Sequence, residues 1–149
     1  MILVTNDLRT RLRANDRAHC AALAAGGREP DPAPVVKFFN PMGAGTWLAS
    51  ELQGDGDTLF GLADLGFGCP ELGCFSLGEL VRIRLPFGLR IERDIAFSSV
   101  LPLSLWAETA RRCGSIPEAQ RLLWRGQAAP PSDLSPSKFP QGPKDGADG

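Results

Sequence analysis

Residues 35–65, VVKFFNPMGAGTWLASELQGDGDTLFGLADL, contain three apolar segments separated by two turns rich in glycine and aspartate or proline. These segments, with their β-branched and aromatic residues, predict strands at Val35–Phe39, Thr46–Leu52 and Thr58–Leu65. Short connections of this composition favour antiparallel neighbours, so we expect a meander. The third segment is apolar on both faces apart from Asp64, which predicts an interior position in the sheet.

Helix signals lie on either side of these strands. Thr5 and the glycines after Ala25 delimit a predicted first helix. A serine followed three residues later by glutamate is a capping box, and this pattern opens a short middle helix and a last one. Apolar residues at helical spacing before Gly114 predict the helix between them. The two capping boxes are Ser76 with Glu79 and Ser115 with Glu118. The apolar residues at helical spacing are Leu103, Trp106, Ala110 and Cys113.

These elements predict an α+β domain over residues 1–125. Alternation over Ile91–Phe97 adds a further strand, which gives an antiparallel sheet of four to five strands. The N-terminal helix, the short middle helix and the C-terminal helices are expected to pack on that sheet. Residues 126–149 are rich in proline and glycine and predict a disordered tail.

Composition excludes some classes of protein. Sixteen basic and seventeen acidic residues give a net charge of −1, which excludes a uniformly basic nucleic-acid binder. The longest charge-free runs have thirteen residues, fewer than the roughly 20 of a membrane helix, so no membrane association is expected. Charges follow from Asp7 onward, which does not fit a signal-peptide core, and a cytoplasmic location is the expectation.

The four cysteines, Cys20, Cys69, Cys74 and Cys113, agree with a reducing compartment. Their spacing is not that of a zinc site, and with a single histidine, His19, neither a metal nor another cofactor is expected. Cys20 and Cys113 are predicted to be small buried residues on helices.

The most distinctive stretch is residues 60–73, FGLADLGFGCPELG. It holds two carboxylates, Asp64 and Glu71, in an apolar and glycine-rich context. If the two converge, they would form an acid–base pair or a site for a hard metal, with Glu51, Glu92 or Asp94 completing a hydrolase site. The alternative is structural: Asp64 accepts from backbone amides of the following turn, and Glu71 is solvated or pairs with an arginine.

The same loop is also typical of a surface that binds another protein. The residues predicted for such a surface are Phe67, Cys69, Pro70 and Glu71. Trp124 stands beside two leucines on a short helix that cannot bury all three, so it is predicted to add a second contact.

Arginine clusters suggest a different partner. If they share one face, they would track the phosphates of a nucleic acid; otherwise they are solvated helix faces. The residues are Arg9, Arg13 and Arg17 on the first helix, and Arg111, Arg112 and Arg121 near the last two.

Short motifs in a fixed order cover the chain from Thr5 to about Ile116. They are 34–39 (PVVKFF), 45–48 (GTWL) with Glu51-Leu52, 60–66 (FGLADLG), 70–73 (PELG), Ser76-Leu77 with Glu79-Leu80, 92–94 (ERD) and 102–104 (PLS). In these residues the chain resembles DUF2958, a bacterial family of unknown function. Cys74 departs from the family pattern, which more often has an aromatic residue there.

The resemblance implies a small α+β protein carried by plasmids, conjugative elements and other mobile DNA, with roles in transfer or against host restriction. It implies no established reaction, because a fold does not fix a function. Our first hypothesis is a non-enzymatic module that binds a protein partner. The alternatives are a nucleic-acid-binding accessory protein and a carboxylate- or metal-dependent hydrolase.

Overall fold

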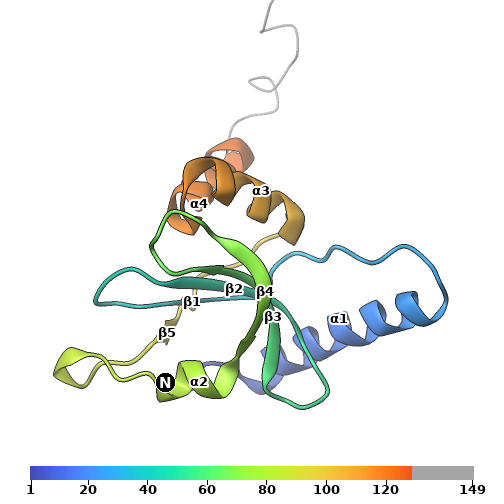
Figure 1. The fold of residues 1–149 in the computed structure, drawn as a ribbon, viewed down its shortest axis with the longest axis horizontal. Helices are drawn as coiled ribbons and strands as arrows, with labels where there is room; N and C mark the ends of the chain where they lie inside the picture. Colours follow the sequence, from blue (N-terminus) through green and yellow to red (C-terminus); the bar gives the residue numbers. More distant parts are fainter. Residues whose placement is uncertain (129–149) are drawn as a thin grey trace, which may run out of the picture. The chain divides into compact units, whose positions relative to one another are not determined.

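The computed structural model describes residues 1–128 (Figure 1). Within them the elements are α1 (Asn6–Ala24), β1 (Val36–Phe39), β2 (Thr46–Leu52), β3 (Thr58–Asp64), β4 (Glu71–Ser76), α2 (Leu77–Arg82), η1 (Pro86–Gly88, a 3-10 turn), β5 (Glu92–Arg93), α3 (Leu103–Cys113) and α4 (Ile116–Ala128). The chain divides into two units, and the boundary falls inside α4, after Ala119. Residues 126–128 close α4, so the tail expected from 126 begins too early, and the rest of it lies outside the described residues.

The sheet has the order β4-β3-β2-β1-β5, and all of its pairings are antiparallel. This confirms the α+β fold, the meander and the interior position of the third predicted strand. β4 lies within a stretch that the sequence analysis interpreted largely as a loop. It adds an edge strand beside β3, with Ala63 opposite Glu71 and Thr58 opposite Ser76.

One face of the sheet carries the main apolar core. Alternate residues of β1, β2 and β3 bury their side chains there against Leu12 of α1 and against α2. Each fully buried Leu or Phe contributes about 1.5–3 kcal/mol relative to exposure. The residues of this core include Val36 and Phe38, Trp47, Ala49 and Leu52, Leu59, and Leu77 with Leu80.

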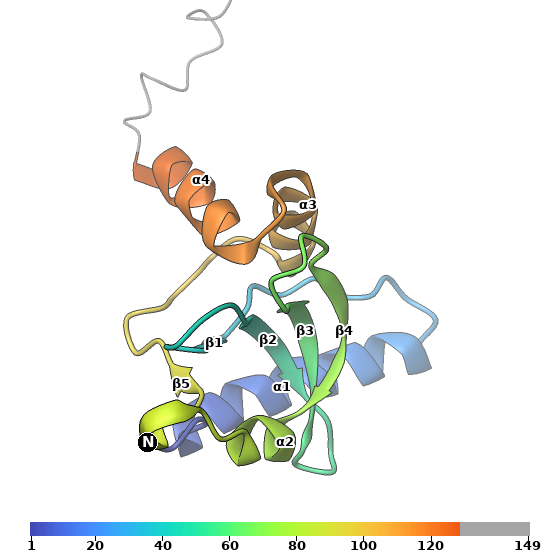
Figure 2. The ribbon, with the colours of Figure 1, turned by 60° about the vertical axis from the view of Figure 1, so that its left-hand side comes forward.

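On the opposite face, Leu48 and Leu62 are fully buried. α3 contacts β3 and β4, and in Figure 2 it lies at the end of these strands that is remote from α2. Trp106 anchors α3: it is 2% exposed, its ring centroid lies 5.9 Å from that of Phe97, and its indole N–H donates to Ser99 Oγ at 3.0 Å. A buried tryptophan whose indole N–H has an acceptor can fix the packing of a helix in this way.

α1 runs along β2 where that strand extends beyond β1. The last register position shared with β1 is Ala49, so the carbonyls that follow need other donors. Asn15 Nδ2 donates to Ser50 O at 2.8 Å, and Arg13 Nη1 donates to Leu52 O at 2.9 Å. The irregularity between Ala49 and Glu51 marks the same segment. These bonds bring the C-terminal half of α1 beside Glu51.

The strand predicted at Ile91–Phe97 is reduced to Glu92–Arg93. The N–H of Asp94 still donates to Lys37 O at 2.9 Å. The Asp94 carboxylate then accepts the N–H of Ala96 at 3.0 Å, which turns the chain away from the sheet. Side-chain competition for the backbone therefore ends this strand early.

Candidate functional site

Asp64 links the end of β3 to the start of α4. Only 3% of the residue is exposed. Its Oδ1 accepts the N–H of Gly66 at 2.9 Å and its Oδ2 accepts the N–H of Ile116 at 2.8 Å. Both oxygens of this carboxylate therefore serve backbone donors, which is the structural alternative considered for Asp64.

Glu71 does not join Asp64 in a common site. It is exposed and lies opposite Ala63, the residue before Asp64. Since successive residues of a strand point to opposite faces, the two carboxylates lie on different sides of the sheet. The three acidic residues considered as additional members also lie elsewhere. Glu92 lies in β5, the edge strand farthest from β4, and Asp94 follows it closely. Glu51 lies in β2 and is bonded to His19. The geometry therefore provides no acid–base pair at Asp64 and Glu71.

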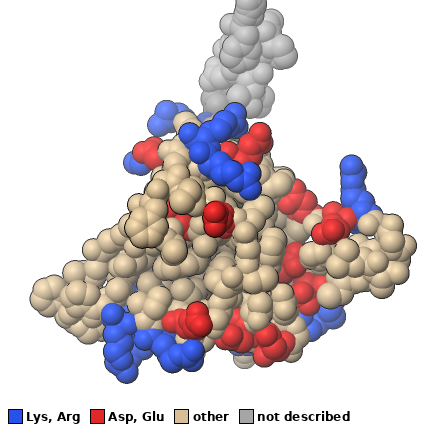
Figure 3. Space-filling model, in the orientation of Figure 1, with Lys and Arg blue, Asp and Glu red and all other residues tan. Residues whose placement is uncertain are grey.

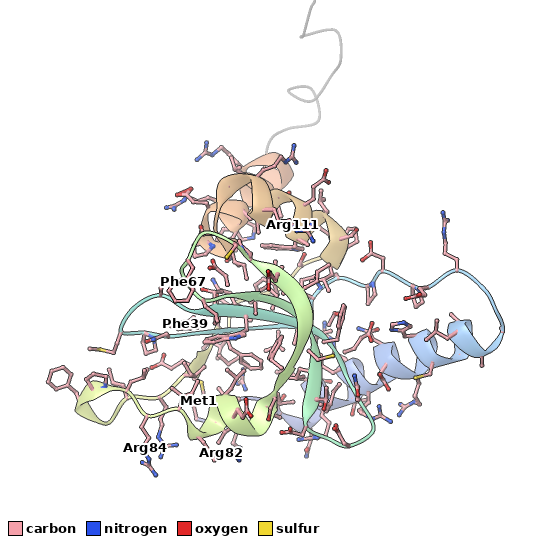
Figure 4. All side chains as sticks on the ribbon, in the orientation of Figure 1. Met1, Phe39, Phe67, Arg82, Arg84 and Arg111 are labelled. Carbon is pink, nitrogen blue, oxygen red and sulfur yellow. The ribbon has the colours of Figure 1, made fainter. Side chains whose placement is uncertain are left out.

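The loop between β3 and β4 exposes large apolar side chains. Phe67 is 83% exposed and Leu65 55%, and Figure 4 marks Phe67 on this loop. Gly66 and Gly68 adopt positive φ angles of 93° and 83°, a conformation that side chains other than glycine rarely take. The glycines thus fold the loop so that Phe67 faces solvent.

Not every residue predicted for this surface lies on it. Cys69 and Glu71 are exposed, and with Leu65, Phe67 and Ala63 they line a hollow of about 230 Å³. Pro70 is fully buried and is therefore not available to a partner. Its ring packs inward where the chain enters β4.

The outer edge of β4 is the second feature of this region. The N–H of Leu77 donates to Asp57 O at 2.9 Å, so Thr58 and Ser76 form a pair that does not exchange ladder hydrogen bonds. Because such pairs alternate along an antiparallel ladder, the backbone groups of Leu72 and Cys74 point away from β3. Within residues 1–128, no hydrogen bond engages the N–H of either residue.

Side chains do not cover this edge. Leu72 is 39% exposed and Cys74 is also exposed. In Figure 2, β4 forms the margin of the sheet, and no strand lies beyond it. We call this region the edge surface: Leu65, Phe67 and Cys69 of the loop, together with Leu72 and Cys74 of β4.

A groove of about 440 Å³ lies between the C-terminal half of α1 and the strands. His19, Cys20 and Leu23 line it from α1, and Glu51, Phe60 and Cys74 line it from β2, β3 and β4. No sequence pattern predicted this groove, which we call the α1 groove. Its two walls come from distant segments, since even Leu23 and Glu51 are 28 positions apart, so no local pattern connects them.

His19 is held between two carboxylates at one end of the groove. Its Nδ1 lies 3.0 Å from Glu51 Oε1, and its Nε2 lies 2.9 Å from Glu29 Oε1. The hydrogen bond to Glu51 raises the pKa of His19 above the ordinary value of 6.5; the charges of Glu51 and Glu29 add to this rise, and desolvation opposes it. Two acceptors require two ring protons, so the arrangement suits the imidazolium form.

The thiols of the groove are not paired with this histidine. Cys74 Sγ accepts from Gln53 Nε2 at 3.7 Å, and Cys20 Sγ lies 4.0 Å from Asp16 Oδ2. Both ring nitrogens of His19 face carboxylates, so neither serves as a base toward a thiol. Cys20 is exposed and Cys113 half-buried, which corrects the prediction that both are buried. No group of three or more metal-ligating side chains occurs in residues 1–128.

The arginines of α1 and α3 lie in separate regions. Arg13 forms an ion pair with Asp16 at 2.8 Å. Figure 4 places Arg111 on α3, and Figure 2 places α1 near the other end of the sheet. In Figure 3, the basic groups at the lower margin of the visible face lie where Figure 4 labels Arg82 and Arg84, which belong to neither cluster. Arg121 belongs to the second unit of the chain.

Two further observations concern partners. Trp124 of α4 is 52% exposed. Among the described residues, no helix combines the length and apolar character that crossing a membrane requires.

Residues 1–119 thus define an α+β protein built on a five-stranded antiparallel sheet, with an open edge strand and a groove beside the first helix. The chain belongs to the family described as Protein of unknown function (DUF2958), whose model matches residues 3–117. The match includes the loop after β3, β4 and both walls of the α1 groove. No curated protein and no solved structure matches the chain.

Proposed function

We propose that this chain is a non-enzymatic binding protein whose edge surface takes up an extended segment of another protein. The observation that carries the proposal is the open backbone of Leu72 and Cys74 beside the exposed side chain of Phe67. An unpaired strand edge is a template for an additional strand. Main-chain hydrogen bonds then supply affinity, and side-chain hollows supply specificity.

The expected segment is extended and apolar at alternate positions. Leu72 and Cys74 project from the same face of β4, so a strand paired with them presents every second side chain beside two apolar groups. The hollow next to Phe67 and Cys69 takes one further apolar side chain. The segment therefore needs four to six residues in strand conformation, roughly the usual length of a β-strand.

A second copy of the chain fits this surface less well. If β4 paired with its own copy so that the outward backbone of Leu72 met that of Cys74, the two-fold axis would lie at Gly73. That register sets Glu71 opposite Phe75, and the paired strands end before they reach Phe67. A segment of another protein is free of this symmetry and reaches both β4 and the loop.

The setting that we propose is a mobile genetic element, with the partner belonging to DNA transfer or to host defence. The support for this setting is the association implied by the family resemblance. The binding proposal stands apart from it and is tested with the isolated chain.

The test selects peptide ligands from a random library displayed on phage, and then measures their affinity for matched variants. Cys74→Pro removes the outward N–H of the edge and leaves the bonds to β3 in place, whereas Cys74→Ser changes only the side chain. Selected peptides should bind wild type and Cys74→Ser within about twofold, and should bind Cys74→Pro at least tenfold more weakly, since the pairing hydrogen bonds are lost.

Two controls make the result decisive. If Cys74→Pro does not fold, Phe67→Ser on the exposed loop tests the same surface and should also weaken binding. Peptides that bind Phe67→Ser and Cys74→Pro as well as wild type would overturn the proposal. A wild-type dimer that Cys74→Pro dissociates in sedimentation equilibrium would assign the edge to a second copy and would overturn the proposed partner.

A further inference from the structure

The α1 groove contains a buried carboxylate with an unused acceptor. Only 6% of the Glu51 side chain is exposed, and its Oε1 is bonded to His19. No residue within 1–128 donates to the second oxygen, Oε2. A buried acceptor without a donor costs free energy, and such groups in native proteins call for an explanation.

Charge indicates which donor suits this site. Glu51 and Glu29 face one histidine; with both carboxylates ionised and the imidazole protonated, the three side chains together carry one negative charge. Asp16, which also lines the groove, is paired with Arg13 at 2.8 Å and adds no net charge. One positive charge from a ligand would balance the group.

The rest of the groove is apolar. Leu23 of α1 is 56% exposed and lines the groove beside Phe60 of β3. Cys20 and Cys74 add soft, weakly polar walls. A ligand pocket typically combines such walls with a few polar groups that fix orientation, and Glu51 is placed to be that group here.

We infer that the α1 groove binds an organic cation, with an ammonium or guanidinium group on Glu51 and an apolar body against Leu23 and Phe60. The cation donates to Oε2 of Glu51, while His19 keeps Oε1 and so holds the carboxylate in position. A free arylalkyl amine and a lysine or arginine side chain of a peptide share this chemistry. The site is distinct from the edge surface, although the side chain of Cys74 borders both.

The test is a titration of the full chain followed by amide NMR signals, with benzylamine as the probe and benzyl alcohol as its neutral counterpart. Benzylamine should shift the amides of Gln53, Phe60 and Cys74 and the ring signals of His19. Benzyl alcohol should bind at least tenfold more weakly. A second arm with the peptide acetyl-Ala-Arg-Ala-amide identifies the source: tighter binding of the peptide than of benzylamine indicates a protein side chain, and the reverse a small molecule.

Glu51→Gln keeps an acceptor for His19 and removes the charge, so it should reduce benzylamine affinity at least tenfold, to that of the alcohol. Glu79→Gln, on the exposed surface of α2, is the matched control and should leave the affinity unchanged. If Glu51→Gln fails to fold, Leu23→Ala should weaken amine and alcohol several-fold, because it removes one wall of the groove.

Three results would overturn the inference. The first is that neither benzylamine nor the arginine peptide shifts the groove amides at millimolar concentration. The second is that amine and alcohol bind equally. The third is that Glu51→Gln, or Leu23→Ala where the first variant is unfolded, binds benzylamine as wild type does.

Discussion

The carboxylate of Asp64 accepts the buried N–H of Ile116 at 2.8 Å, which bonds the end of β3 to the first residue of α4 across 52 positions of sequence. A second bond to the N–H of Gly66 holds the start of the exposed loop. One side chain thus fixes both the connection to α4 and the geometry of the loop that carries Phe67.

Replacing Asp64 with alanine should destabilise the protein by about 2–4 kcal/mol, because two backbone donors lose a charged acceptor. Glu71→Ala, which changes the other carboxylate of the same stretch, should stay within about 0.5 kcal/mol, since Glu71 is exposed. Urea unfolding of both variants measures the difference. Equal stability of the two variants would contradict the structural role of Asp64.

Gly61 and Gly73 face each other across β3 and β4, yet their environments differ. A Cβ on Gly61 would lie 1.8 Å from Leu48 O, whereas a Cβ on Gly73 would meet nothing within 4 Å. Gly61→Ala should therefore destabilise the protein by about 3 kcal/mol or more, and Gly73→Ala by less than about 1 kcal/mol. Thermal and urea unfolding test this pair, and a tolerated Gly61→Ala would show that β2 and β3 approach less closely.

His19 makes stability depend on pH. Since its pKa is raised in the folded state, chiefly by the hydrogen bond to Glu51, its contribution is complete below the unfolded value of 6.5 and is lost as pH rises through the folded pKa. The urea midpoint of wild type should therefore fall relative to that of His19→Gln as the pH rises from 6 to 8.

The sole histidine of the chain gives an unambiguous NMR titration of the same group. Its measured pKa should exceed 6.5. Glu51→Gln should lower the pKa of His19 more than Glu29→Gln, because Glu51 supplies the largest effect and Glu29 is 60% exposed. A titration midpoint of His19 at or below 6.5 in the wild type would contradict the arrangement in which Glu51 and Glu29 bond its two ring nitrogens.

Local signals explain which elements the sequence predicted well. β2 is bounded by turns rich in glycine, and its predicted range, Thr46–Leu52, is also the observed one. The cap at Thr5 is confirmed by its bond to the N–H of Leu8, and Gly114 ends α3 in the left-handed conformation, with φ at 89°. These features depend on neighbouring residues, so periodicity and capping rules are sufficient to predict them.

Non-local features could not be predicted in the same way. β4 contains Gly73 and begins with an exposed glutamate, so its composition resembles a loop, and only pairing with β3 makes it a strand. The contact between His19 and Glu51 joins residues 32 positions apart and depends on the irregularity in β2. Phe67 and Pro70 were both predicted for a binding surface; Phe67 is exposed, whereas Pro70 is buried by tertiary packing that no local pattern indicates.

Amide hydrogen exchange at β4 tests the central claim most directly. In the free protein, the outward amides of Leu72 and Cys74 should exchange rapidly, while Gly73 and Phe75, which are bonded to β3, should exchange slowly. A bound peptide selected on the wild-type protein should slow Leu72 and Cys74 at least tenfold. A bound peptide that leaves both amides at their free rates would contradict binding by strand addition at this edge.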